Sequence, residues 1–407
     1  MKKILSLVLT ALLLTAGLSA CGQTDDKLYV YNWGEYLSDG IYGDRDNISA
    51  FEEYYEEVTG RSIEVYYTTY PSNEDMYAKI SSGTSKYDVI FPSDYMVQRL
   101  IVEDLLRPIN IEEVCAKYGT ECYYDTVTEE FRGLYFDPED KYSVPYTYGR
   151  VGIIYNSTMV DEEDCTGYEI LWNEKYAGKI LQFNNSRDAF STAQYMLGID
   201  VNTTDPADWE LVYEKMLEQK PLVQSYVMDE IYNKMESGEA ALAAYYAGDF
   251  FTMQEVNEDL EFFYPEETNI FVDCMCVPAG SGNPEAAALF INYMLTAEAA
   301  IPNAECLFYA SPHECVYTDE EYLDDMGEDV VEVLYPEDFN FQEELNRYAF
   351  RNLDPDTLEL INSLWEELKI EGGLPDSIYI TAAALAIAIA AIIISRLWIR
   401  RKRAKWY

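Results

Sequence analysis

The chain has 407 residues, of which 74 are acidic and 28 are basic, and its formal net charge is −46. This acidic excess repels phosphate and excludes a protein that holds nucleic acid through basic patches. Apolar residues make up 49% and aromatic residues 14%, which argues against disorder and supplies the cores of about two domains. With His313 as its single histidine, the chain has no metal site built on several histidines.

The first twenty residues have the pattern of an export signal. Met1-Lys2-Lys3 precedes an apolar run from Ile4 to Leu14, and small residues come directly before Cys21. A cysteine at this place resembles the bacterial lipoprotein signal, so we expect cleavage after residue 20 and a lipid on Cys21. The alternative is an ordinary signal peptide that happens to be followed by a cysteine.

Strands and helices alternate after this signal. Residues 27–32 and 62–67 alternate as strands do, and 87–91 is a short apolar run, whereas 48–59 and 73–80 have helical spacing and stop near a glycine. Strands that alternate with helices predict a mostly parallel sheet and an α/β class. No low-complexity linker interrupts the chain before residue 372, so we expect a compact fold over about 27–369.

Seven cysteines follow Cys21, and their spacing fits no zinc motif. Cys115 and Cys122, and likewise Cys306 and Cys315, are close enough in sequence to be candidate disulfides in an exported protein. A reducing habitat without disulfides is equally open.

The C-terminal region carries an uncharged stretch, Ser377 to Ser395, dominated by Ala and Ile. A helix of about 19 residues at 1.5 Å per residue nearly matches a hydrocarbon core of about 30 Å. Basic residues follow in 396–407, and positive flanks stay cytoplasmic. We therefore expect a transmembrane helix over 377–395, a cytoplasmic tail, and a protein held at the outer face of the cell membrane. A buried helix of a soluble domain is the alternative.

A series of motifs carries a family resemblance. They are Tyr31-Asn-Trp-Gly-Glu-Tyr36, Tyr70 to Lys79, Tyr87 to Ile90 with Pro92-Ser93, Ser143 to Tyr146, Asn202 to Pro206, Gly238-Glu239 and Ile270 to Pro278. In this order they resemble the spermidine/putrescine-binding proteins of bacterial ABC importers, over roughly residues 27–370. The resemblance implies a polyamine receptor that is not an enzyme, needs no cofactor or metal, and works with ABC permease subunits.

The resemblance also implies a two-lobed periplasmic-binding-protein fold of type II, whose lobes close over a ligand in the cleft. We expect one lobe from 21–150 and 273–320 and the other from 151–272 and 321–370. Hinge crossings are then expected near Val151, between Glu267 and Val272, and about residue 320.

A polyamine needs carboxylates for its ammonium groups and flat apolar walls for its methylenes, and aromatic faces also attract cations. The ligand contacts that the resemblance implies are, in chain order, Trp33, Glu35, Tyr36, Ser93, Tyr95, Asn185, Asp188, Tyr246, Phe271, Asp273, Tyr309 and Arg351. Asn185 stands where the family has an acid, Tyr246 and Phe271 stand where it has tryptophans, and Arg351 aligns with a glutamine. A missing acid and an arginine in the cleft would favour a diamine over a triamine.

Other roles for these residues stay open. They are core packing for Trp33 and Tyr36, exposed acids for Asp188 and Asp273, and helix capping for Ser93. Two other functions also stay open. Tyr245-Tyr246 is compatible with a ferric-ion receptor, and the many acids with an extracellular hydrolase, although no Gly-x-Ser-x-Gly element is present.

Overall fold

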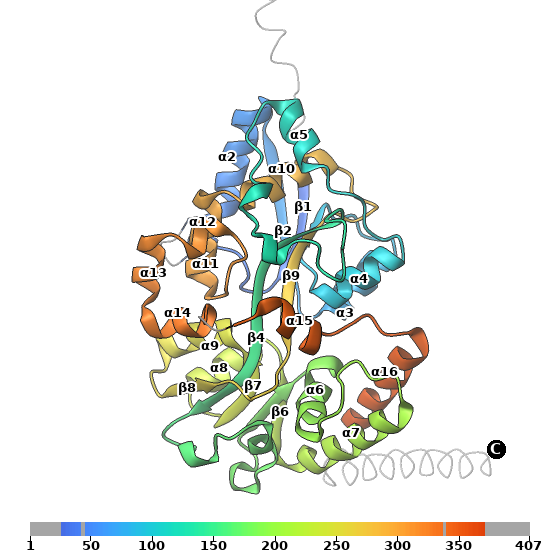
Figure 1. Cartoon of the computed structure of the whole chain (residues 1–407), viewed down its shortest axis with the longest axis vertical. Coiled ribbons are helices and arrows are strands. Elements are labelled where there is room, and N and C mark those ends of the chain that lie inside the picture. The colour runs from blue at the N-terminus through green and yellow to red at the C-terminus, as the bar shows by residue number, and fades with distance from the viewer. Residues whose placement is uncertain (1–25, 42–44, 337–338, 371–407) are drawn as a thin grey trace, which may run out of the picture.

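The computed structural model describes residues 26–41, 45–336 and 339–370, which form two α/β lobes stacked along the long axis of the molecule (Figure 1). One buried core is built from residues 28–146, 270–309 and 341–349, and the other from 151–260, 310, 334 and 353–368. We call them the first lobe and the second lobe. The two-lobed α/β fold expected from the sequence is therefore present.

The first lobe lies at the top of Figure 1. Its strands are β1 (Asp26–Trp33), β2 (Ile63–Tyr70), β3 (Val89–Ile90), β9 (Ile270–Cys276) and the first half of β4 (Ser143–Asn156). Its helices are α2 (Asn47–Thr59), α3 (Asn73–Ser81), α4 (Asp94–Val102), α5 (Ile111–Tyr118), α10 (Pro284–Met294), α11 (Ala297–Leu307), α12 (Glu314–Tyr317) and α13 (Glu320–Met326).

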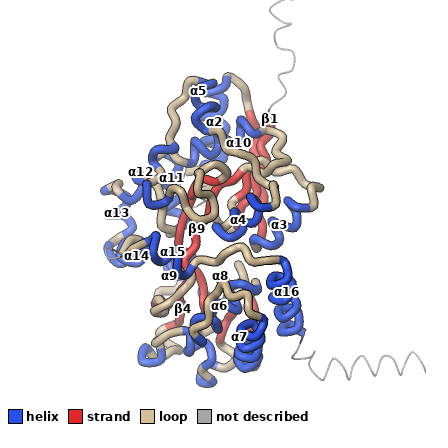
Figure 2. Tube along the Cα trace, turned by 45° about the vertical axis from the view of Figure 1, so that its right-hand side comes forward, coloured by secondary structure: helices blue, strands red, loops and turns tan. Residues whose placement is uncertain are grey.

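The second lobe completes β4 and adds β5 (Ile180–Phe183), β6 (Val223–Val227), β7 (Leu242–Tyr246) and β8 (Leu260–Phe263). Its helices are α6 (Ser186–Leu197), α7 (Pro206–Gln219), α8 (Glu230–Glu236), α9 (Ala247–Val256), α14 (Glu328–Leu334) and α16 (Pro355–Ile370). Helix α15 (Phe341–Tyr348), between α14 and α16, packs on the core of the first lobe. Figure 2 shows helices on both sides of the strands in each lobe.

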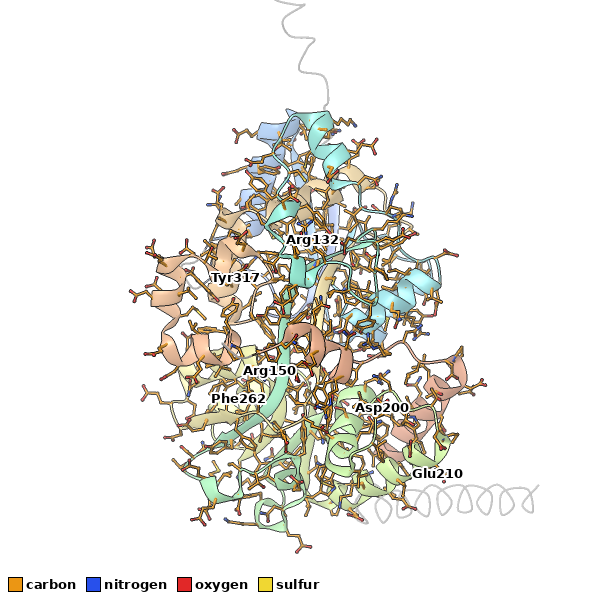
Figure 3. All side chains as sticks on the ribbon, viewed as in Figure 1. Arg132, Arg150, Asp200, Glu210, Phe262 and Tyr317 are labelled. Carbon is orange, nitrogen blue, oxygen red and sulfur yellow. The ribbon has the colours of Figure 1, made fainter. Side chains whose placement is uncertain are left out.

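One strand joins the two lobes. The strands follow the order β2-β1-β3-β9-β4-β7-β5-β6, with β8 also paired to β4. Residues 143–150 of β4 pair with β9, and residues 151–156 pair with β7 and β8. Figure 3 labels Arg150 on β4 between the lobes, with Arg132 above it and Asp200 below it. The strand β4 therefore belongs to the sheets of both lobes and connects them through continuous backbone hydrogen bonding.

Several helices begin directly after strands that end at the space between the lobes. β2 is followed by α3, β3 by α4, β5 by α6, β6 by α8 and β7 by α9, each within a few residues. In open α/β sheets the ligand crevice lies outside the carboxyl ends of such strands. The topology thus points the first turns of five helices at one cleft.

The expected C-terminal transmembrane helix requires a correction. Within 26–41, 45–336 and 339–370, no helix is both long and apolar enough to cross a membrane. The fold that the structure supports is the two-lobed α/β fold without a spanning helix. The signal over 1–20, Cys21, the stretch 377–395 and the tail 396–407 lie outside the described residues.

Neither of the two candidate disulfides is present in the described part of the chain. Cys115, Cys122 and Cys315 carry free thiols, so neither of the two short-range pairs is joined. Cys274 and Cys276 are fully buried on β9, where they pack as small apolar side chains.

Asp88 is a buried acid that fastens the sheet of the first lobe to the loop after β9. Its carboxylate accepts hydrogen bonds from the backbone of Tyr29 at 3.0 Å, the hydroxyl of Ser281 at 2.7 Å and the backbone of Asn283 at 2.9 Å. The side chain is 2% exposed. Hydrogen bonds to a charged acceptor are stronger than neutral ones, and buried donors left without an acceptor are costly.

Replacing Asp88 should destabilise the protein strongly. We expect Asp88→Ala to lower the free energy of unfolding by about 3–5 kcal/mol, because three buried donors lose their acceptor. The free energy of unfolding of Asp88→Asn should lie between those of Asp88→Ala and wild type. Asp125→Ala, at a side chain that is 99% exposed, is the control and should change stability by no more than about 0.5 kcal/mol. Chemical denaturation measures all three, and equal stability of Asp88→Ala and Asp125→Ala would contradict the role of Asp88.

Candidate functional site

A cavity with about 830 Å³ of empty space, its open mouth included, lies between the lobes. The first lobe contributes Trp33, Gly34, Tyr36, Pro71, Ser72, Asn73, Glu74, Ser93, Asp94, Tyr95, Phe271, Asp273, Tyr309 and Phe350. The second lobe contributes Asn185, Asp188, Met228, Asp229, Tyr232, Tyr245, Tyr246, Asp249 and Asn269. Because both lobes supply walls, a ligand here would contact both and favour their closed arrangement.

Six carboxyl groups face this cavity, and no basic side chain lines it within the described residues. The acids are Glu74, Asp94, Asp188, Asp229, Asp249 and Asp273, of which four lie in the first turn of α3, α4, α6 or α9. The positive end of a helix dipole favours an acid at that place. The helix N-termini therefore help to hold negative charge in the cleft, and a cation is the ligand that complements it.

Tyrosine hydroxyl groups hold these carboxylates in place. Tyr95 donates to Glu74 at 2.9 Å, and Tyr246 donates to Asp188 at 3.1 Å. Tyr309, a residue of the first lobe, donates to Asp249 at 2.8 Å and so links the two lobes. A phenol is a neutral donor, so it orients a carboxylate without cancelling the charge that a cationic ligand would meet.

Aromatic rings form the apolar wall of the cavity. The ring of Phe271 lies 5.4 Å from that of Tyr246 and 6.2 Å from that of Tyr309, and Tyr36 meets Tyr309 edge to face at 5.3 Å. The ring of Tyr309 packs directly on Gly248, where an added Cβ would lie 2.4 Å from a ring carbon. These rings are thus fixed against backbone and offer flat faces to an alkyl chain or a cation.

Burial raises the pKa of most of these acids. The pKa of Asp188, Asp249 and Asp273 rises to about 6, and that of Asp94 rises to about 8. Desolvation of the charged form is the largest cause at all four. A bound cation would reverse this effect, because it stabilises the ionised carboxylates.

The structure brings together ten of the twelve side chains expected at the site. Glu35 and Arg351 are the exceptions, since neither lines the cavity. Arg351 instead stacks over the ring of Tyr135 at 3.2 Å and donates to the backbone of Asn346 at 3.2 Å. Arg351 therefore lies outside the cavity lining, and the condition under which it would occupy one end of the cleft is not met in this structure.

Two other expected residues have local structural partners as well. Asn185 accepts from the backbone of Asp188 at 2.9 Å and caps α6, which is why an amide suits this position. Ser93 is the N-cap residue of α4 but makes no capping bond with its side chain, and its hydroxyl accepts from Asn73 at 3.0 Å. The hydroxyl of Ser93 is therefore held by Asn73, another residue of the cavity lining.

Sequence reasoning missed four of the six acids. Glu74 lies inside one of the motifs noted above, and Asp94, Asp229 and Asp249 each stand within three residues of a strand end or at a helix start. Their position in the sequence could have indicated them, because acids in the first helical turn after a strand lie together at one edge of a parallel sheet. Among 74 acids in the chain, that signal was weak.

Comparison with known proteins agrees with this architecture. Residues 49–327 match the family model of the bacterial extracellular solute-binding proteins. The chain belongs to this family. A relative from Salmonella typhimurium, named a spermidine/putrescine-binding periplasmic protein, is 33% identical over 77% of this chain and 85% of its own length. A protein of the same name from Escherichia coli is 31% identical with the same coverage.

A solved structure extends the likeness. It is a spermidine/putrescine ABC transporter substrate-binding protein from Streptococcus pneumoniae, 31% identical, with a TM-score of 0.64 over 85% of this chain and 99% of its own. The resemblance to spermidine/putrescine-binding proteins found in the motifs is thus confirmed.

The comparisons also correct the expected location. The relatives are named periplasmic proteins, and the described part of the binding protein has no helix that could span a membrane. The expectation of a protein held at the cell membrane by a C-terminal spanning helix, with its tail in the cytoplasm, is therefore not retained.

The raised pKa values predict how the stability of the empty binding protein depends on pH. An acid whose pKa is higher in the folded state holds its proton there after the unfolded chain has lost it, so stability falls as pH rises. For Asp94 this window runs from about 4, its usual range, to about 8. We expect the thermal midpoint of wild type to fall more steeply between pH 5 and 8 than that of Asp94→Asn. Glu210→Gln, at an exposed site on α7, should follow wild type. Parallel slopes in wild type and Asp94→Asn would contradict the assignment.

Proposed function

We propose that this binding protein captures a polyamine, putrescine or spermidine, in the cleft between its lobes and delivers it to an ABC importer. The observation that carries the proposal is the lining of the cavity, where six carboxyl groups and a wall of aromatic rings meet without a basic side chain among the described residues. The names of its relatives agree with this ligand class.

The chemistry of the cavity suits an alkyl chain with a charge at each end. Carboxylates of Glu74 and Asp188 lie on α3 and α6, and Asp229 and Asp249 lie near α8 and α9, so acids come from different sides of the cleft. Rings of Tyr246 and Phe271 supply apolar faces for methylene groups. Each cation that meets a ring face gains about 0.5–2 kcal/mol in addition to its carboxylate contacts.

The structure removes the two reasons for expecting a diamine. One reason was a shortage of acids caused by Asn185, yet Glu74, Asp94, Asp229 and Asp249 add carboxyl groups to the cavity. The other was Arg351, which does not line it. The proposal therefore covers diamine and triamine ligands alike.

A ferric-ion receptor is less compatible with the site. Tyr246 donates its hydroxyl hydrogen to Asp188, and burial raises the pKa of Tyr245 and Tyr246 well above the usual range. Iron needs phenolate oxygens, and this environment favours the neutral phenols. The described residues also hold no group of three or more His, Cys, Asp or Glu side chains placed to bind a metal.

We also propose that the binding protein is a receptor without catalytic activity. Its family consists of solute-binding proteins, and at least four of the cavity acids are held by tyrosine hydroxyls that a ligand would leave in place. The export signal over 1–20 and the lipid on Cys21 stay predictions of the sequence, because they lie outside the described residues. ABC permease subunits are the proposed partners.

Calorimetric titration tests the proposed ligand directly. We expect putrescine and spermidine to bind with a dissociation constant in the micromolar range or below, and butylamine, with one ammonium group, to bind at least tenfold more weakly. Ferric citrate should not bind, and spermidine recovered after long incubation should be unchanged. Saturable binding of ferric ion together with no heat from either polyamine would contradict the proposal.

Removal of Asp273 should weaken polyamine binding strongly. Asp273 lines the cavity from β9, is 4% exposed, and accepts from the hydroxyl of Tyr36 at 2.7 Å, so it is a buried acid in the wall that a cationic ligand meets. Loss of one partner of a buried charge pair costs about 2–5 kcal/mol, so Asp273→Asn should weaken binding by about a hundredfold. Glu210 is an exposed acid of the second lobe, labelled in Figure 3. The control Glu210→Gln also removes one negative charge and should change the affinity for polyamine less than about twofold. An equal effect of both substitutions would mean that only the overall charge matters.

A further inference from the structure

Arg187 is a buried cation at the boundary between the two lobes. It lies in the first turn of α6 in the second lobe, directly before Asp188, and is 4% exposed. Its guanidinium carbon lies 5.5 Å from the centre of the Tyr95 ring and 4.5 Å from that of the Phe350 ring, and both rings line the cavity. Tyr95 belongs to α4 and packs on the core of the first lobe, so its contact with Arg187 joins one lobe to the other.

Hydrogen bonds fix the plane of this guanidinium. It donates to the backbone oxygens of Arg351 at 3.2 Å and Val201 at 3.4 Å, and to the side-chain oxygen of Asn202 at 3.2 Å. The side chain of Asn202 also accepts from the backbone of Arg351 at 2.7 Å. All three acceptors of Arg187 are neutral groups, so these bonds orient the planar cation and do not neutralise it.

The tyrosine that Arg187 contacts in turn positions an acid of the cavity. Tyr95 donates its hydroxyl to Glu74 on α3 at 2.9 Å, and its ring meets that of Phe350 edge to face at 5.9 Å. Arg187 lines a neighbouring crevice, together with Glu74 and Tyr95, but it does not line the cavity itself. The two rings are therefore what a ligand in the cavity meets, and the guanidinium supports them from outside the lining.

We propose that Arg187 is a positioning residue for ligand capture, whose stacking on Tyr95 holds the lobes closed over the bound polyamine. The inference rests on the proposed function and concerns a residue that does not contact the ligand. Opening of the cleft separates α4 from α6, because they belong to different lobes, so the contact stabilises the closed arrangement alone. In that arrangement it also fixes the tyrosine that orients Glu74.

The exchange kinetics of putrescine with the full-length Arg187→Lys variant test this role. Lysine keeps the positive charge that opposes the raised pKa of Asp188, but it lacks the planar, forked group that stacks and donates at once. Because the ligand first meets the open form, we expect dissociation to be about tenfold faster than from wild type and association to change less than about twofold. Stopped-flow tryptophan fluorescence measures both rates.

Arg132→Lys is the matched control for this experiment. Arg132, labelled in Figure 3, stacks on the ring of Tyr124 at 4.7 Å and donates to the backbone oxygens of Val127 and Tyr124, all within the first lobe. Both rates should therefore stay at their wild-type values in Arg132→Lys. A comparable increase of the dissociation rate in the two variants would overturn the proposal.

A double-mutant cycle separates contact between the lobes from a general effect on the second lobe. If Arg187 acts through the ring of Tyr95, then Arg187→Lys should speed dissociation less than about threefold in a Tyr95→Leu background, because the contact is already missing. Equal fold-changes in the wild-type and Tyr95→Leu backgrounds would overturn the positioning role. An unchanged dissociation rate in Arg187→Lys would do the same, while the proposed function stands.

A second measurement needs no substitution at Arg187. Small-angle X-ray scattering at saturating putrescine compares Tyr95→Leu, which lacks the ring, with Tyr95→Phe, which lacks only the hydroxyl. We expect Tyr95→Phe to close as wild type does and Tyr95→Leu to keep a larger radius of gyration. Equal closure of these two variants would overturn the proposal, whereas absence of putrescine binding by wild type would overturn the proposed function as well.

Discussion

A cluster of carboxyl groups buried in the cleft between the lobes is the feature on which the rest of this structure depends. Six carboxyl groups surround the cavity, and burial makes their ionised forms costly, as the raised pKa values of Asp94, Asp188, Asp249 and Asp273 record. The fold tolerates this cost through helix N-termini and tyrosine hydroxyls, which stabilise charge without neutralising it. A cationic ligand would neutralise the remaining negative charge of these carboxyl groups.

The buried acids also make contacts between the two lobes. Tyr309 belongs to the first lobe and donates to Asp249 of the second, and Gly34 lies so close to Asp229 that an added Cβ would be 2.9 Å from its carboxylate. Contacts of this kind bring acids of one lobe against backbone and rings of the other. A cation between the lobes lowers the repulsion among the acids, so it should favour the closed arrangement over the open one.

The continuous strand β4 is one of the connections that such closure must bend. Its first half pairs with β9 in the first lobe, and its second half pairs with β7 and β8 in the second. The chain also crosses between the lobes at 260–270, 309–310, 334–341 and 349–353, so rotation of one lobe against the other with both cores intact would change backbone torsions at these crossings as well as near residue 150. Arg150 at this point stacks over the ring of Tyr264 at 3.6 Å, which ties the crossing to the second lobe.

The sequence by itself determined the α/β class and the early strands and helices, and the family resemblance pointed to most of the aromatic rings that line the cavity. These features follow from local sequence patterns and from motifs such as Tyr31 to Tyr36, whose aromatic and acidic residues are evident from the sequence. It did not determine which acids face the ligand. Asp94 and Asp249 look like ordinary first-turn acids in a chain with 74 of them, and only strand order brings them to one cleft. The sequence also placed Arg351 in the site, whereas the tertiary structure stacks it on Tyr135. Burial and orientation decide whether a charge meets water, a neighbour or a ligand, and both arise from contacts between segments far apart in the chain.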